Sequence, residues 1–238
     1  MDPNFKISLP FFEIGPKAYI YGKQVISLAR FADEISEKYQ IDIIFTPQYV
    51  DIYPIAQATK KLLVFSQHMD SLMPGRGIGT VLPEAVKEAG ACGVMLNHAE
   101  RPLSLPEIEL TIARADEVGL ASMVCAGNMT EVDAVARLAP NILLAEAPEL
   151  IGTGTRTQAD LKVIKLINDT VWRINPHIKV LHSAGIHDEN DVFQMISNGA
   201  QATGSTSGIL KANDPYQMLE AMIVATRNAW DKLHNKIS

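Results

Sequence analysis

The strongest constraint on the fold of this chain is a repeated alternation of short apolar runs with longer amphipathic segments. Eight runs have the length of buried strands, and the segments between them carry apolar residues at helical spacing. We predict strands at 7–14, 41–45, 62–66, 92–96, 120–125, 142–145, 178–182 and 200–204, and helices at 24–39, 52–61, 82–89, 105–117, 129–138, 158–174, 190–197 and 215–233. Strands that alternate with helices pair in parallel through right-handed crossovers.

Eight repeats with short connections indicate an α/β fold, a closed (β/α)8 or TIM barrel, as a single domain over residues 1–238. An open doubly wound sheet is the alternative. It would need a phosphate-binding fingerprint after the first strand, and neither GxGxxG nor GxxxxGK[ST] occurs. In a barrel the active site lies at the carboxyl ends of the strands, so the residues directly after each run are the candidates for function.

The composition excludes several classes of partner. A net charge of -6 and a pI near 5.5 argue against nucleic acid or an anionic membrane. Cys92 and Cys125 each lie inside an apolar run, which is typical of buried thiols in a reducing compartment. There is no apolar stretch of membrane-spanning length and no signal-peptide pattern at the N-terminus, so we expect a soluble, cytoplasmic protein.

Polar residues gather where the predicted strands end. Glu146 closes the run 142–145 and is followed by the flexible triplet 152–154, Gly-Thr-Gly, while His98 follows the fourth strand. A carboxylate can remove a carbon-bound proton while a neutral imidazole polarises the adjacent carbonyl, and Gly/Ser-rich segments after the last two strands can hold a phosphate. His68 and His98 lie on different strands without an HExxH pattern, and no GxSxG occurs. We therefore expect no metal and no cofactor.

Several segments are similar to one known family. Residues 97–101 (NHAER) resemble the NHSER-like segment of triosephosphate isomerases, and 146–154 (EAPELIGTG) resemble their catalytic-glutamate and lid segment in its short, archaeal form. Residues 81–90, 117–125 and 183–186 are similar as well. The resemblance runs from about residue 40 to the C-terminus.

The resemblance implies a cofactor-free aldose–ketose isomerase that interconverts glyceraldehyde 3-phosphate and dihydroxyacetone phosphate through an enediol(ate), working as a homodimer or homotetramer. This family is the standard example of a glutamate base paired with a neutral histidine, so these roles come from the resemblance. Carried over by position, the catalytic roles fall on Glu146 as the base, His98 as the electrophile and Glu100 as the acid that supports His98. Residues 147–155 would form the lid, in which Ile151 and Gly152 contact the phosphate. The backbone amides of Gly185, Thr206 and Ser207 would also bind the phosphate.

The end of the first strand departs from the family pattern. The family carries Asn-x-Lys there, with a lysine that binds the negatively charged substrate. In the stretch 13–17, EIGPK, we place Glu13 at the Asn position and Gly15 at the Lys position. Lys17 remains as the candidate substrate-binding cation, provided that the loop bulges. Smaller departures are Ile78, Ala99 and Ala147.

These departures leave the substrate open. The first hypothesis is triose-phosphate isomerisation; the second keeps the mechanism on a related short sugar phosphate, such as a tetrulose phosphate. A third is a non-catalytic phosphate-binding barrel that has lost its strand-one lysine. A barrel synthase of aromatic amino-acid biosynthesis fits the phosphate end but not the placement of Glu146 and His98. Two roles stay open for Glu13, an ion pair with Lys17 or a contact to substrate hydroxyls, and the sequence does not choose between them. For His68 we expect a loop or interface role rather than a place in the pocket.

Overall fold

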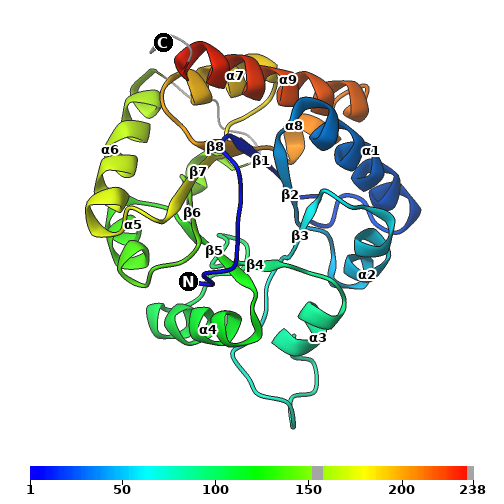
Figure 1. Ribbon diagram of the computed structural model, residues 1–238. Coiled ribbons are helices and arrows are strands. Elements are labelled where there is room, and N and C mark those ends of the chain that lie inside the picture. Colours follow the sequence, from blue (N-terminus) through cyan, green and yellow to red (C-terminus); the bar gives the residue numbers. More distant parts are fainter. Residues whose placement is uncertain (152–157, 235–238) are drawn as a thin grey trace.

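Eight parallel strands close into a barrel in the order of the sequence (Figure 1). The structure, a computed structural model, describes residues 1–151 and 158–234. The strands are β1 (Phe11–Ile14), β2 (Asp42–Phe45), β3 (Leu63–Ser66), β4 (Gly93–Leu96), β5 (Ala121–Ala126), β6 (Ile142–Glu146), β7 (Lys179–Ser183) and β8 (Ala202–Gly204). Pairing of β1 with β8, with Glu13 opposite Gly204, closes the sheet. The predicted fold is confirmed.

Helices surround the barrel and return the chain to the start of each next strand (Figure 1). They are α1 (Lys23–Tyr39), α2 (Tyr49–Ala58), α3 (Pro83–Glu88), α4 (Leu105–Val118), α5 (Met129–Arg137), α6 (Gln158–Ile174), α7 (Glu189–Ser197), α8 (Ser207–Leu210) and α9 (Pro215–His234), with a 3-10 turn, η1 (Pro148–Leu150). Local signals set some boundaries: Ser104 and Glu107 form a capping box at the start of α4, and Gly119 ends that helix in a left-handed conformation.

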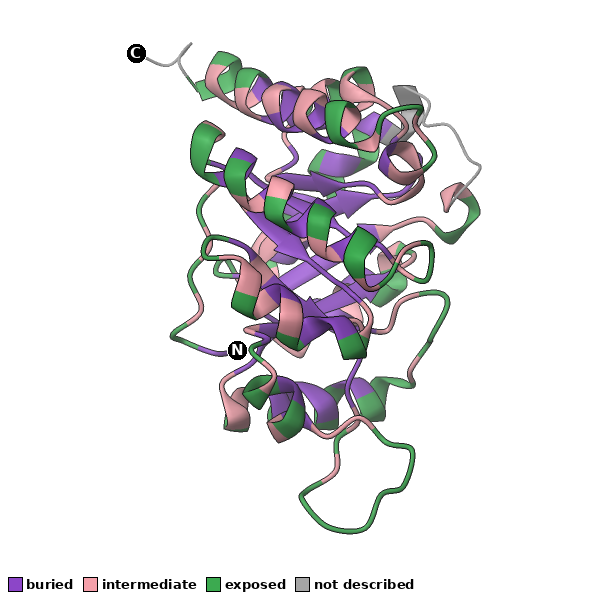
Figure 2. Cartoon of the chain, turned by 90° about the vertical axis from the view of Figure 1, so that its right-hand side faces the viewer, coloured by how far each residue is buried: buried purple, intermediate pink, exposed green. Residues whose placement is uncertain are grey.

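The apolar side chains form two cores. One fills the barrel and includes Phe11, Ile44, Phe65 and Leu144; the other lies between the strands and the helices. Figure 2 shows the strands as the buried centre of the molecule. Both faces of each strand are therefore covered, which explains why the strands read in the sequence as unbroken apolar runs.

The first ten residues cross the end of the barrel opposite the carboxyl ends of the strands (Figure 1). Phe5 packs edge-on against Phe65 inside the barrel, with ring centroids 5.8 Å apart. The buried amide of Asn141 binds both backbone groups of Asp2, accepting from its N–H at 3.2 Å and donating to its carbonyl at 2.9 Å. The N-terminal segment therefore seals the floor of the interior core.

The predicted boundaries differ from the structure at a few places. The first strand begins at Phe11 rather than at residue 7, directly after Pro10, which has no N–H to give to a ladder. The second helix begins at Tyr49 instead of residue 52 and accommodates Pro54 in its interior. The short elements η1 and α8 were not predicted, because single turns carry no periodic signal.

One long loop stands away from the barrel. Residues 71–80, between β3 and α3, project from the rim and are almost entirely exposed (Figures 1 and 2). Ile78 in this loop is fully exposed. Among the described helices, none combines the length and the apolar character needed to cross a membrane.

Candidate active site

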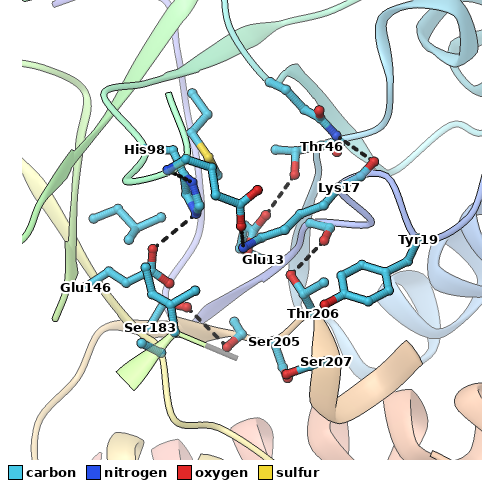
Figure 3. Close-up of a pocket in the computed structure, with 18 of the residues that line it drawn as sticks. Glu13, Lys17, Tyr19, Thr46, His98, Glu146, Ser183, Ser205, Thr206 and Ser207 are labelled. Atoms are coloured by element: carbon cyan, nitrogen blue, oxygen red, sulfur yellow. Dashed lines mark hydrogen bonds and ion pairs between the residues drawn. The ribbon is translucent and has the colours of Figure 1, made fainter. Parts of the chain in front are cut away.

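The carboxyl ends of the strands surround one cavity of about 480 Å³. Loops after seven of the eight strands contribute to it or reach its rim, and Figure 3 shows the polar side chains pointing toward its centre. Of the residues predicted for the site, the lining includes Lys17, His98, Glu100, Glu146, Ile151, Gly185, Thr206 and Ser207. Gly152 lies outside the described residues.

His98 and Glu146 face each other across this cavity (Figure 3). The imidazole Nε2 is 3.3 Å from Glu146 Oε2, and the two side chains are only 13% and 11% exposed. On the other side of the ring, Nδ1 accepts the backbone N–H of Glu100 at 3.1 Å. A neutral imidazole that accepts at Nδ1 carries its proton on Nε2, so the N–H bond is directed into the cavity.

The backbone before His98 is held in a left-handed turn. Asn97 has φ of 56°, which costs energy for a non-glycine residue. Two hydrogen bonds of its side chain stabilise this turn. The amide donates to the Cys125 carbonyl at 3.0 Å, and the amide oxygen accepts the Leu103 N–H at 2.9 Å. The strand end therefore delivers His98 in one defined orientation.

Lys17 enters the cavity and pairs with Glu100. Its Nζ lies 2.6 Å from Glu100 Oε1, on the side of the cavity that faces His98 and Glu146 (Figure 3). Burial acts to raise the pKa of the Glu100 carboxyl, but the hydrogen bond and charge of Lys17 outweigh it, so this pKa lies below its usual value. The carboxylate of Glu100 therefore holds the lysine, while its backbone, not its side chain, contacts the histidine.

The loop that carries Lys17 is strained and firmly anchored. Lys17 has φ of 49°, and its carbonyl accepts the side-chain amides of Gln48 at 2.8 Å and Gln67 at 3.2 Å. The hydroxyl of Thr206 donates to the Gly15 carbonyl at 2.7 Å. Groups from β2, β3 and β8 thus fix the lysine in place, a long-range arrangement that sequence spacing does not reveal.

This geometry corrects the sequence correspondence at the end of β1. The sequence pattern places Glu13 at the family's Asn position and Gly15 at its Lys position, whereas the cation that enters the cavity is Lys17. In an Asn-x-Lys pattern that ends at Lys17, the Asn position falls on Gly15. A lysine that follows β1 therefore lies in the cavity, and residue 15, two positions before it, is a glycine.

The segments after β7 and β8 form the other wall. Ala184 and Gly185 have φ of 68° and 65°, and Ser205 is tied to this turn because its hydroxyl donates to the Ile186 carbonyl at 2.9 Å. The backbone N–H groups of Gly185 and Ser207 donate to no other described residue. Exposed N–H groups that converge on a cavity are typical of an anion site.

For one carboxyl in the cavity the sequence leaves two roles open. Glu13 lies in β1, lines the cavity, and is 4% exposed. Burial raises its pKa from 4.5 to about 7; a hydrogen bond from Thr46 partly offsets this, and the nearby charge of Glu146 adds to it. The sequence feature that marks Glu13 as a candidate is its place as a single acid inside the apolar run FFEI.

The other candidate histidine lies away from this chemistry. His68 is buried, is not among the cavity-lining residues, and has Nε2 3.2 Å from Asp70 Oδ1. Burial lowers the pKa of His68, against the opposing effect of Asp70. Asp70 also accepts the Val81 N–H at 2.6 Å, so His68 and Asp70 together anchor the two ends of the projecting loop.

Comparison with known proteins agrees with this geometry. The family model described as triosephosphate isomerase matches residues 17–222. The triosephosphate isomerase of Methanosarcina mazei is 40% identical over 90% of this chain and 97% of its own, and that of Sulfurisphaera tokodaii is 33% identical over 94% and 98%. The crystal structure of triosephosphate isomerase from Bartonella henselae shares the fold with a TM-score of 0.72 at 17% identity, covering 90% of this chain and 99% of that one. With the barrel, the facing histidine and glutamate and these relatives in agreement, the chain belongs to the triosephosphate isomerase family and is an isomerase.

Proposed function

We propose that this protein interconverts glyceraldehyde 3-phosphate and dihydroxyacetone phosphate without a cofactor. The observation that carries the proposal is the 3.3 Å approach of His98 Nε2 to Glu146 Oε2 in a cavity that also holds the Lys17 ammonium. The names of the relatives support the same reaction. Homo-oligomeric assembly and a cytoplasmic location remain predictions.

The isomerisation moves one proton between adjacent carbons and one hydroxyl proton between the oxygens that they carry. The Glu146 carboxylate takes the proton from the carbon beside the carbonyl, and the electron pair left behind forms an enediol(ate). The N–H at His98 Nε2 donates to the oxygen on which negative charge develops and relays the proton of the neighbouring hydroxyl to that oxygen. Glu146 then returns the carbon-bound proton to the neighbouring carbon. The anchored backbone of His98 keeps the ring aligned during both steps.

Charged groups around this pair bind the substrate. Lys17 supplies a positive charge at the reacting end, and Glu100 holds its ammonium at 2.6 Å from one carboxylate oxygen. The N–H groups of Gly185, Thr206 and Ser207 bind the phosphate. Ile151 lines the cavity from the segment after Glu146, which supports a closing contact over the substrate together with Gly152. In this proposal Glu100 is a positioning residue for Lys17 and His98.

The position of Lys17 argues against one of the two alternative functions. The non-catalytic barrel was motivated by the loss of the strand-one lysine, and a lysine inside the cavity removes that motivation. Isomerisation of a related short sugar phosphate, such as a tetrulose phosphate, keeps one specific observation in its favour. That observation is the additional carboxyl of Glu13 in the cavity, where it offers an extra polar contact.

Steady-state rates on triose and tetrulose phosphates, with Glu146 variants, test the proposal. We expect Glu146→Gln to lower kcat by about 10²–10⁴-fold, since it removes the base without changing the volume of the side chain. Glu109, which is exposed on α4 and does not line the cavity, offers the matched control Glu109→Gln with wild-type activity. Isomerase activity that survives Glu146→Gln would show that the base is elsewhere, and negligible turnover of triose phosphates by the wild type would exclude the first hypothesis.

A further inference from the structure

Glu13 is a buried acid with an open approach to the catalytic cavity. It lies on β1 with 4% of its surface exposed, and Figure 3 shows it beside Lys17 and between His98 and Thr206. The proton transfer between Glu146 and His98 does not use it. Burying an ionisable group costs free energy unless it has partners, so the groups around Glu13 indicate what the carboxyl binds.

The space around the Glu13 carboxyl is shaped by two glycines. A Cβ on Gly15 would lie 2.9 Å from Glu13 Oε1, and a Cβ on Gly204 would lie 2.9 Å from Oε2 and 2.6 Å from the Glu13 carbonyl oxygen. The backbone contact excludes a side chain at residue 204, and a side chain at residue 15 would displace the Glu13 carboxyl. The carboxyl therefore occupies volume that its neighbours on β8 and after β1 leave empty.

Only half of the carboxyl is satisfied within the protein. Thr46 Oγ1 donates to Oε1 at 2.9 Å, whereas Oε2 receives no hydrogen bond from the described residues and is not fully enclosed. Buried carboxyl oxygens normally have a partner. Oε2 thus has capacity for a ligand at the cavity floor, where the charged and titratable groups that interact with Glu13 are Glu146, His98, Lys17 and the thiol of Cys125.

We propose that Glu13 is a substrate-contacting residue, whose Oε2 accepts a hydrogen bond from a hydroxyl group of the bound sugar phosphate and so selects among sugar phosphates. The inference rests on the proposed function, because the ligand is the sugar phosphate isomerised in the same cavity. A site built to bind a substrate hydroxyl discriminates strongly against analogues that do not present it there. The pKa of about 7 fits this role, since a carboxyl poised near neutrality exchanges hydrogen bonds with a hydroxyl in either protonation state.

The test compares kcat/KM for glyceraldehyde 3-phosphate, dihydroxyacetone phosphate and a four-carbon ketose phosphate between pH 5.5 and 9. The proteins are the wild type, Glu13→Gln, Glu13→Ala and the control Asp51→Asn. Asp51 is also a buried acid, but it accepts the Gly22 N–H at the start of α1, outside the cavity. Circular dichroism and thermal melting establish that each variant is folded.

We expect both Glu13 variants to change the ratio of kcat/KM between three- and four-carbon substrates by about 10- to 100-fold, as for the loss of a hydrogen bond to a charged group. The ionisation near pH 7 in the wild-type profile should disappear from both, and Asp51→Asn should keep both properties. Folded Glu13 variants with the wild-type substrate ratio and pH profile would overturn this inference alone. A wild type that isomerises none of the three substrates would overturn the proposed function as well.

Discussion

The buried carboxyl of Glu13 should make the stability of this protein fall as pH rises. The pKa of Glu13 in the folded protein is raised from 4.5 to about 7 by burial, so the native state binds this proton more tightly than the unfolded chain does. Between these two values the native state holds more protons, and stability therefore decreases with increasing pH. The penalty is absent below pH 4.5 and fully developed above about pH 7.

The size of this stability change follows from the difference between the pKa values of Glu13 in the folded and unfolded states. Each tenfold change in that equilibrium corresponds to about 1.4 kcal/mol, so ionised Glu13 destabilises the fold by about 3 kcal/mol above pH 7. Glu13→Gln keeps the shape and removes the ionisation. Relative to the wild type, this variant should gain about 3 kcal/mol in free energy of unfolding between pH 4.5 and 8.

Denaturant unfolding of both proteins over this pH range, at one fixed protein concentration, measures the difference. The contributions of distant titrating groups cancel between the two proteins. Glu146, His98 and Lys17 face Glu13, and their charges act on its ionisation. Glu13→Ala serves as the control. Its free energy of unfolding should depend on pH in the same way as that of Glu13→Gln, but it should be lower by a constant amount because packing is lost. A wild-type-minus-Gln difference that stays constant across the range would refute the argument.

Three further perturbations test the surroundings of the cavity. Lys17→Met should lower kcat/KM about 10²–10³-fold through loss of charge stabilisation, while Lys23→Met, at an exposed lysine on α1, should not; equal effects would contradict the role of Lys17. Gly15→Ala should lower both stability and activity because its Cβ meets Glu13, and Glu13→Ala should rescue it in unfolding and rate measurements; additive effects would exclude this contact. Asn141→Ala should reduce the free energy of unfolding by about 2–4 kcal/mol, since it strands the buried backbone groups of the N-terminal segment; the argument fails if unfolding is unchanged.

The order of elements and the barrel were accessible from the sequence. Strands that are buried on both faces leave continuous apolar runs, and the helices between them show their own period, so local patterns carry the architecture. His98 and Glu146 stood out for a related reason. Each directly follows such a run, and residues at the carboxyl ends of barrel strands point into one cavity.

Positions that depend on packing were harder to predict. The sequence pattern places the lysine position at residue 15, whereas the lysine that enters the cavity is Lys17, because spacing alone does not show which way a short loop turns. The left-handed backbone of Lys17 and the amides of Gln48 and Gln67 determine that direction. The same limit applies to Glu100, whose carboxylate holds Lys17 while its N–H holds the histidine ring.

The sequence by itself determined the barrel, the cavity's place at one end of it, and the facing pair His98 and Glu146, because each follows from a pattern local to one strand and its end. Only the tertiary structure decided what surrounds that pair. Glu13 is positioned by Thr46 after β2, Gly15 after β1 and Gly204 on β8, which meet only when the barrel closes. Its raised pKa comes from its burial in the closed barrel. The burial of Glu13 and its closeness to these residues arise from the closure of the barrel, so no single segment of the sequence reveals them.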